Sequence, residues 1–229
     1  MPTDHAEKRI RIDAGGSYKV SGGVPLIHRR VVKSTEGEPL EWDPVGAPEE
    51  RIPAGERYAL CRCGHSATAP LCDGSHHRVG FVGELTADRR PSAQRRGAFP
   101  GPGLTLTDDA ILCSETGFCR TCLTDVWEMV ERAGDPEVRA RLIRMVQNCP
   151  SGRLQLNLED GPDVEPEYEP SIAVVPDGPL WVRGGIAVVD PDGTPYEVRN
   201  RVTLCRCGKS KRKPFCDGCH EDRRFQGQR

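Results

Sequence analysis

Apolar and polar residues alternate in short runs in both halves of the chain, and turn residues bound each run. Alternation with a period of two predicts β-strands that bury one face. In each half, an aromatic-containing strand is followed by a glycine pair, Gly22-Gly23 or Gly184-Gly185. The strands expected on this pattern are residues 18–20, 26–32 and 57–60, and again 181–183, 186–189 and 201–204. The sequence therefore predicts one strand–turn–strand unit used twice.

The middle of the chain has a helical period instead. Residues 135–137 (Asp-Pro-Glu) supply an N-cap, a proline at the first helical position and an acid in the first turn. Apolar residues then recur on one helical face as far as Cys149, and Pro150 ends the helix. Short strands are expected on both sides of this helix, at residues 104–107 and 153–158.

Two connectors rich in turn residues separate these parts. Residues 87–103 are basic and residues 159–170 are acidic, and such charge runs are typical of solvated linkers. The predicted domains are residues 1–86, 104–160 and 170–229. The predicted fold class is α+β, with an α+β unit inserted between two small β-rich units.

Composition limits the core and the partners. Of 229 residues, 25 are Gly and 20 are Pro, which favours short strands and tight loops. The net charge of −2 gives no general attraction to nucleic acid or to a membrane surface. No apolar run reaches the roughly 18 residues of a spanning helix, and the first twelve residues contain no signal core. We therefore expect a cytoplasmic protein.

The eleven cysteines carry the chemistry of this chain. Their number is odd and no secretion signal precedes them, so a disulfide framework is disfavoured. Eight residues form two copies of one motif, C-x-C-x8-C-x3-H, with matching Ser, Pro, Asp and Gly between the ligands. Three thiolates and one imidazole suit a thiophilic metal, either iron–sulfur or structural zinc. The candidate ligands are Cys61, Cys63, Cys72 and His76, then Cys205, Cys207, Cys216 and His220.

The repeated motif resembles the CDGSH iron–sulfur family, also called NEET proteins. The resemblance covers residues 57–81 and 201–225 with every ligand matched. It implies one 2Fe-2S cluster at each motif, held by three Cys and one His, and two β-rich units packed as an internal pseudo-dimer. A His ligand should raise the cluster potential above that of an all-Cys site. Because His titrates near neutral pH, it should also make the cluster sensitive to acid.

The central cysteines suggest a third cluster. Cys113, Cys119 and a Cys149-Pro150 step at the end of a helix resemble single-cluster bacterial ferredoxins over residues 104–158. Thr116 stands where the four-iron pattern has a further cysteine, which favours 3Fe-4S. Cys122 could supply a fourth ligand and allow 4Fe-4S. A 2Fe-2S cluster ranks behind these two, and the alternative is a degenerate domain with free thiols.

The two copies of the motif are not equivalent. The second has four cationic residues between Gly208 and Pro214, including Lys213 at the family's usual lysine position, where the first has Ala69. Positive charge favours the reduced state, so we expect the second cluster to have the higher potential. Cys219 replaces the usual serine and is interpreted as a spare thiol. His65 and His77 are expected to be solvent-facing neighbours of the ligands.

These features favour a multi-cluster iron–sulfur protein acting in electron transfer, redox sensing, or cluster storage and transfer. The alternatives are a zinc-binding interaction module and a redox subunit of an oxidoreductase system. No phosphate loop, dinucleotide fingerprint or nucleophile motif is found, so we expect no enzyme activity. The expected partner is a redox protein or an apo-protein cluster acceptor, with no nucleic acid or membrane, and the chain is expected to be a monomer.

Overall fold

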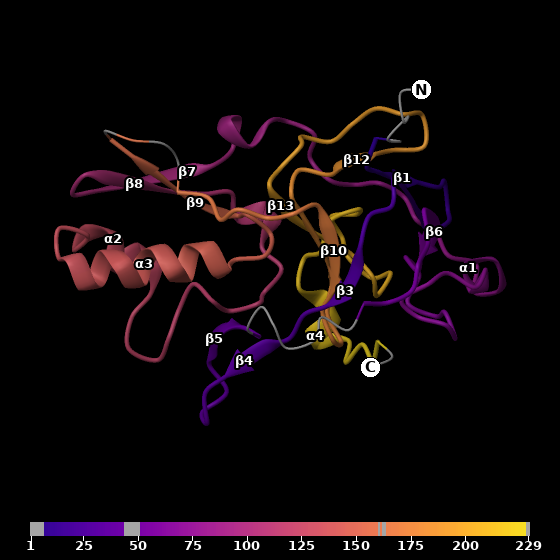
Figure 1. The fold of residues 1–229 in the computed structure, drawn as a ribbon, viewed down its shortest axis with the longest axis horizontal. Coiled ribbons are helices and arrows are strands. Elements are labelled where there is room, and N and C mark those ends of the chain that lie inside the picture. Colours follow the sequence, from indigo (N-terminus) through magenta and orange to yellow (C-terminus); the bar gives the residue numbers. More distant parts are fainter. Residues whose placement is uncertain (1–6, 44–50, 160, 162–163, 228–229) are drawn as a thin grey trace, which may run out of the picture.

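The computed structural model describes residues 7–43, 51–159, 161 and 164–227. Its architecture is mixed α+β, with several small sheets and short helices (Figure 1). Along the longest axis, the outer parts of the sequence lie at one end and the central part lies at the other. Within the described ranges, no helix is long and apolar enough to cross a membrane.

Two four-stranded sheets combine strands from both ends of the chain. In the first sheet, with order β12-β1-β2-β6, the strands are β1 (Arg9–Ile12), β2 (Tyr18–Ser21), β6 (Arg57–Leu60) and β12 (Ala187–Val189). In the second, with order β13-β11-β10-β3, they are β3 (Leu26–His28), β10 (Ser171–Val174), β11 (Leu180–Arg183) and β13 (Arg201–Leu204).

Each half of the chain contributes one strand to the sheet of the other half. β12 pairs in parallel with β1, and β3 pairs in parallel with β10, whereas the remaining pairs in both sheets are antiparallel. A glycine pair precedes each exchanged strand, and all four glycines have positive φ. Glycine adopts this region without a steric penalty, so the chain can turn there and cross to the other sheet.

One continuous apolar core lies between the two sheets. Its members include Ile10, Tyr18, Ile172, Val182 and Leu204, all nearly inaccessible to solvent. Every residue of β11 and of β13 is buried, whereas only one residue of β6 is buried. The second sheet is therefore covered on both faces, and the first sheet keeps one face toward solvent.

The central unit is a three-stranded antiparallel sheet covered by two helices. Its elements are β7 (Gly97–Gly101), β8 (Leu104–Asp108), β9 (Leu154–Leu158), α2 (Val126–Glu131) and α3 (Pro136–Asn148). Leu104, Leu106, Leu142 and Val146 are fully buried between them. The Asp135 side chain accepts hydrogen bonds from the second and third amides of α3, as the capping prediction requires.

A hairpin from the first half joins the central unit to the second sheet. It consists of β4 (Val31–Lys33) and β5 (Pro39–Trp42), whereas the sequence predicted a single strand at residues 26–32 in place of β3 and β4. Trp42 stacks on Trp181 with ring centroids 4.4 Å apart. The Trp42 indole N–H donates to the carbonyl of Asn148 at 3.0 Å. This aromatic contact fixes the central unit against the outer units.

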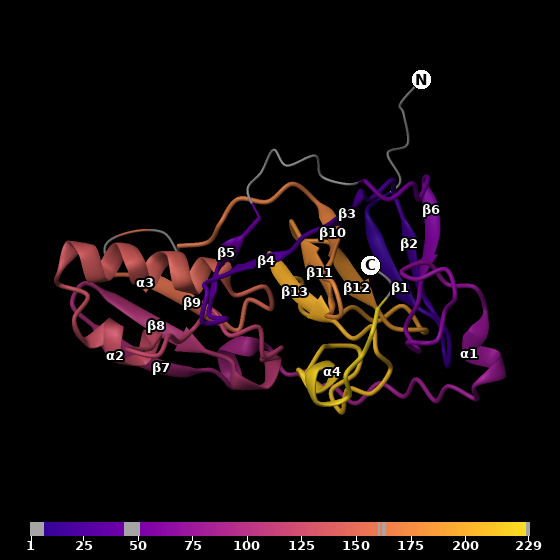
Figure 2. The same ribbon diagram turned by 90° about the horizontal axis from the view of Figure 1, so that it is seen from below.

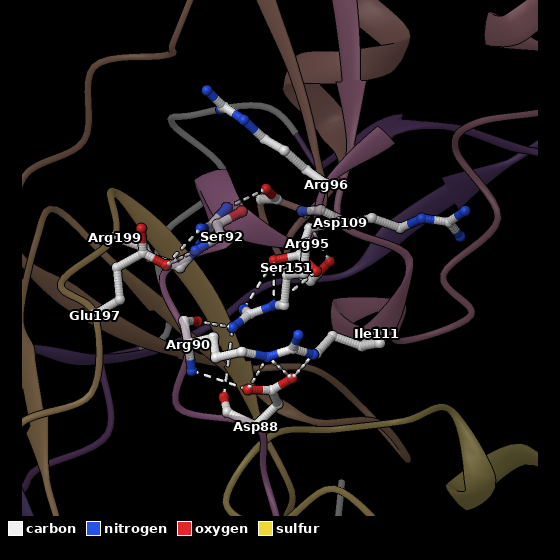
Figure 3. Close-up of polar contacts among 12 residues, drawn as sticks. Asp88, Arg90, Ser92, Arg95, Arg96, Asp109, Ile111, Ser151, Glu197 and Arg199 are labelled. Carbon is white, nitrogen blue, oxygen red and sulfur yellow. Dashed lines mark hydrogen bonds and ion pairs between the residues drawn. The ribbon is translucent and has the colours of Figure 1, made fainter. Parts of the chain in front are cut away.

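The basic connector differs from the expected solvated linker. It contains the short 3-10 helix η1 (Ser92–Gln94) and the strand β7, so the central sheet begins before residue 104. Arg95 forms a bidentate ion pair with Asp109, and their side chains are 9% and 2% exposed (Figure 3). The Ser92 amide donates to Glu197 at 2.9 Å. Buried pairing therefore attaches this charged segment to the folded structure.

Candidate metal centres

The first motif brings its four predicted ligands together as two pairs. Cys61 and Cys63 follow β6 directly, and their sulfurs are 3.7 Å apart. Cys72 precedes a turn into the short helix α1 (Ser75–Arg78), which carries His76. The Cys72 sulfur and His76 Nδ1 are 3.5 Å apart.

The second motif has the same construction. The Cys205 and Cys207 sulfurs are 3.7 Å apart, and the Cys216 sulfur lies 3.3 Å from His220 Nδ1. Cys205 follows β13, and His220 lies in the short helix α4 (Cys219–Asp222). The repeated sequence therefore produces the same local geometry twice.

An aspartate and a glycine shape the turn between the third cysteine and the histidine. The Asp73 carboxylate accepts from the amides of Ser75 and Ala67, both at 2.9 Å. Hydrogen bonding from the Ser75 side chain, followed by the Ala67 and Ser75 amides, holds the pKa of Asp73 well below its usual range. Gly74 has a φ of 83°, a left-handed conformation that other residues rarely adopt. Asp217 and Gly218 repeat this arrangement in the second motif.

The pair distances fit metal ions that each take two protein ligands. A tetrahedral ion with metal–sulfur bonds of about 2.3 Å holds two thiolates about 3.8 Å apart, and a thiolate and an imidazole nitrogen about 3.6 Å apart. The observed separations are close to these values. Among the described residues, no three His, Cys, Asp or Glu side chains are placed to hold one ion. This geometry fits a two-iron cluster better than a single four-ligand zinc.

A buried arginine stands between the paired cysteines of each motif. Arg62 and Arg206 are 2% and 1% exposed, and each donates to backbone carbonyls. Within the described ranges, neither has a carboxylate at ion-pair distance, and Arg206 Nη1 has no hydrogen-bond partner. Burial lowers the pKa of Arg206 to about 10, and the nearby Cys61 charge opposes that shift. Buried cations without a carboxylate suit a site that holds an anionic cluster.

The two motifs differ in exposure. Cys216 and His220 are only 3% and 7% exposed, whereas Cys72 and His76 are half-buried. Burial lowers the pKa of both histidines, which favours the neutral form that can bind metal. Lys213 Nζ donates to the Ser210 carbonyl at 2.6 Å, beside the more buried motif. The higher potential of the second cluster stays a prediction, since burial opposes the effect of the nearby cations.

The central cysteines converge on a small cavity. Cys113 follows the 3-10 helix η2 (Ala110–Leu112), Cys119 precedes α2, and Cys149 caps the end of α3. All three line the cavity, together with Thr116 and Arg153. Burial, together with smaller contributions from the charges of Cys149 and Cys113, raises the pKa of Cys119 to about 11. Three thiols around one cavity match a three-cysteine 3Fe-4S site, whereas a 4Fe-4S cluster with four cysteine ligands would need one more thiol.

Some of the other predicted residues lie apart from these sites. Cys122 is exposed, is not part of the cavity lining, and its amide donates to Glu38. His65 and His77 are exposed, as expected. Cys219 lies beside a ligand, with its sulfur 3.9 Å from that of Cys207. The structure therefore does not place Cys122 as the fourth ligand of the central site.

Sequence reasoning did not identify several residues that shape the sites. The arginines between the paired cysteines are among them, although their occurrence in both copies was a usable signal. Gly64 and Gly208 each lie against the other motif, because an added Cβ would be 2.6 Å from the Cys207 oxygen or 2.5 Å from the Cys63 oxygen. The close approach of the motifs depends on tertiary packing, so spacing alone could not reveal it.

Comparison with protein-family models agrees with this geometry. Residues 15–77 and 177–221 match the family described as "Iron-binding zinc finger CDGSH type". Residues 99–159 match the family described as "Divergent 4Fe-4S mono-cluster". No curated protein and no solved structure matches the chain significantly. The chain is therefore an iron–sulfur protein with two CDGSH segments on either side of a divergent mono-cluster segment, as the resemblance predicted.

Proposed function

We propose that this protein transfers single electrons through three iron–sulfur clusters. Each CDGSH segment holds one 2Fe-2S cluster, and the central cavity holds one 3Fe-4S or 4Fe-4S cluster. The two CDGSH units act as an internal pseudo-dimer with the central domain as an insertion, a proposal supported by the reciprocal exchange of β3 and β12.

The observation that carries this proposal is the pairing of ligands at both motifs. Cys61 with Cys63 and Cys72 with His76 are spaced for two separate metal ions. The second motif repeats both separations. A zinc-binding interaction module, the main alternative, would require all four ligands around one ion, and the ligand spacing does not favour it.

The residues around the sites suit repeated changes of charge without rearrangement. The clusters would supply reversible one-electron chemistry. Arg62 and Arg206 place fixed positive charge beside the anionic sites, and their backbone partners hold the guanidinium groups in position. Arg153 does the same beside the central cavity, where its ion pair with Asp108 fixes its orientation. Prepositioned charge reduces the reorganisation that accompanies electron transfer.

A cluster-transfer function is the second candidate, and the exposure of the first site favours it. Cys72 and His76 are half-buried, so an apo-protein acceptor could reach them more easily than their buried counterparts. Under either function the partner is a protein, and we propose neither an enzymatic reaction nor a nucleic-acid or membrane partner.

Iron and sulfide analysis with an anaerobic redox titration tests the proposal. The holoprotein should contain acid-labile sulfide and should take up and release electrons reversibly without losing iron. Cys72→Ser and Cys216→Ser should each remove one of two 2Fe-2S EPR signals. Zinc without acid-labile sulfide would refute the iron–sulfur assignment. Loss of iron to an apo-ferredoxin faster than electron exchange would favour cluster transfer instead.

A further inference from the structure

We propose that the three sites form a linear relay, with the second CDGSH site between the central site and the first CDGSH site. Electrons then pass between the central and first sites by way of the second. The proposal rests on the function proposed above and adds the order of the sites, which the order along the sequence does not give.

The central site contacts the second motif directly. The loop between Cys113 and Cys119 carries Glu115, which packs on Gly218 of the second motif. A Cβ added to Gly218 would lie 2.2 Å from the Glu115 Cγ. Arg212 of the second motif donates to the Ile111 carbonyl at 2.8 Å, two residues before Cys113. Thus the approach to the central cavity and the turn of the second motif are in contact.

One cleft is shared by the central and second sites. A cavity of about 720 Å³ is lined by Thr116 and Pro150 of the central site and by His220 of the second motif. The charge of Cys113 also raises the pKa of the Cys216 thiol, although burial is the main cause of that shift. These contacts support a short path between the central cysteines and the Cys216–His220 pair.

The second motif also contacts the first motif. Gly64 and Gly208 each approach the backbone of the opposite motif so closely that neither position has room for a side chain. The buried Tyr18 hydroxyl of the first unit donates to the carbonyls of Cys205 and Pro214, at 2.9 and 3.1 Å. Arg206 lies close enough to the Cys61 charge for it to affect the arginine pKa, burial being the larger influence.

The first motif lies at the far end of the molecule from the central unit. In both views α4 lies between α1 and the central unit along the long axis (Figures 1 and 2). The first site is therefore the end of the relay, and its half-buried histidine is its contact with an external partner.

The proposed step moves one electron and breaks no bond. An external one-electron reductant, dithionite in the experiment below, supplies the electron. When an electron leaves the central site, that site is oxidised by one unit and the second site is reduced by one unit. The second and first sites then exchange in the same way, so charge balances at each step.

Magnetic coupling between the sites tests the order. In the fully reduced holoprotein, an unpaired spin at the central site should speed the relaxation of the second-site EPR signal. Removing the central cluster by Cys119→Ser should slow relaxation of that signal and leave the first-site signal unchanged. His220→Cys and His76→Cys identify the two signals, because an all-Cys site has a lower potential. An effect of Cys119→Ser on the first-site signal alone, or on both equally, would overturn the proposed order.

A glycine pair supplies a matched test of the contact itself. Gly218 and Gly74 occupy the same motif position with φ of 82° and 83°, but Gly74 has no atom within 4 Å of its added Cβ. Gly218→Ala should displace the Glu115 loop and reduce the relaxation enhancement at the second site. Gly74→Ala should leave the relaxation enhancement at the second site unchanged. Equal effects of both substitutions would contradict the contact, whereas absence of iron and sulfide in the wild type would refute the proposed function itself.

Discussion

The Arg95–Asp109 ion pair should be the main attachment of the basic connector. Arg95 Nε lies 3.0 and 3.1 Å from the two Asp109 oxygens, and Nη2 lies 2.8 Å from one of them. Asp109 also begins the segment that leads into Cys113. Replacing it by asparagine keeps the side-chain shape and removes the negative charge. The Arg95 guanidinium then stays buried with only uncharged partners.

The size of the effect follows from the burial of both groups. Breaking a buried pair by removing one partner costs about 3 to 5 kcal/mol. Arg95 keeps its bonds to the Asp88 and Arg90 carbonyls, so we expect the lower end, about 3 kcal/mol. For a chain of this size, 1 kcal/mol shifts the unfolding midpoint by about 2 to 4 °C. Asp109→Asn should therefore lower the midpoint by about 6 to 12 °C.

Thermal unfolding followed by circular dichroism measures this shift, and the central cluster should be the first cluster lost on heating, as followed by EPR of samples frozen after heating. The control is Asp88→Asn, which breaks a nearby exposed pair with Arg90 and should leave the midpoint close to that of wild type (Figure 3). Arg95→Met combined with Asp109→Leu removes both charges and should recover most of the loss. Equal midpoints for Asp109→Asn and Asp88→Asn would refute the reasoning.

Three further outcomes are expected. Cys122→Ser should leave the central cluster in place because this thiol is exposed and outside the cavity, and loss of that EPR signal would make Cys122 a ligand. Below pH 6.5, the ordinary histidine pKa, the first cluster should lose its visible absorbance before the second. Burial lowers the pKa of both His76 and His220, but only His76 is half-exposed and so more accessible to protons. Simultaneous loss of both clusters would contradict this order. Hydrogen peroxide treatment of apo-protein should form a Cys207–Cys219 disulfide, detectable by mass spectrometry and absent in Cys219→Ser; an unchanged peptide map in the wild type would exclude it.

The sign of the acid effect follows from the direction of the histidine shifts. Each folded-state pKa lies below the ordinary value, so the folded protein binds fewer protons than the unfolded chain. This contribution to stability is present above pH 6.5 and is lost as the pH falls through the folded-state pKa. Protonation also removes the nitrogen lone pair that binds metal. Both effects act in the same direction at each site.

The sequence by itself determined the local chemistry of the sites. Cys61, Cys63, Cys72 and His76 lie within sixteen residues, and a strand, an Asp-Gly turn and one helical turn bring them together. Residues close together in the sequence set the geometry of these ligands, so their spacing alone was enough to identify them. The same holds for α3, whose cap and terminal proline act on their own backbone. The small helix α2 carried a weaker pattern and was missed.

Only the tertiary structure decided how the sites are arranged. The exchange of β3 and β12 pairs strands far apart in the sequence, and no local pattern specifies which partner a short strand takes. The contact between Glu115 and Gly218 helps to bury the second motif more deeply than the first, although the two motifs have the same ligand spacing. Similarly, the sequence predicts that Arg95 belongs to a solvated charge run, whereas in the folded structure it is buried and pairs with Asp109. Burial and ion pairing arise from packing between distant segments. Tertiary packing therefore sets the difference in burial between the two CDGSH sites and the spatial order of the three sites, whereas the sequence already defined their ligands.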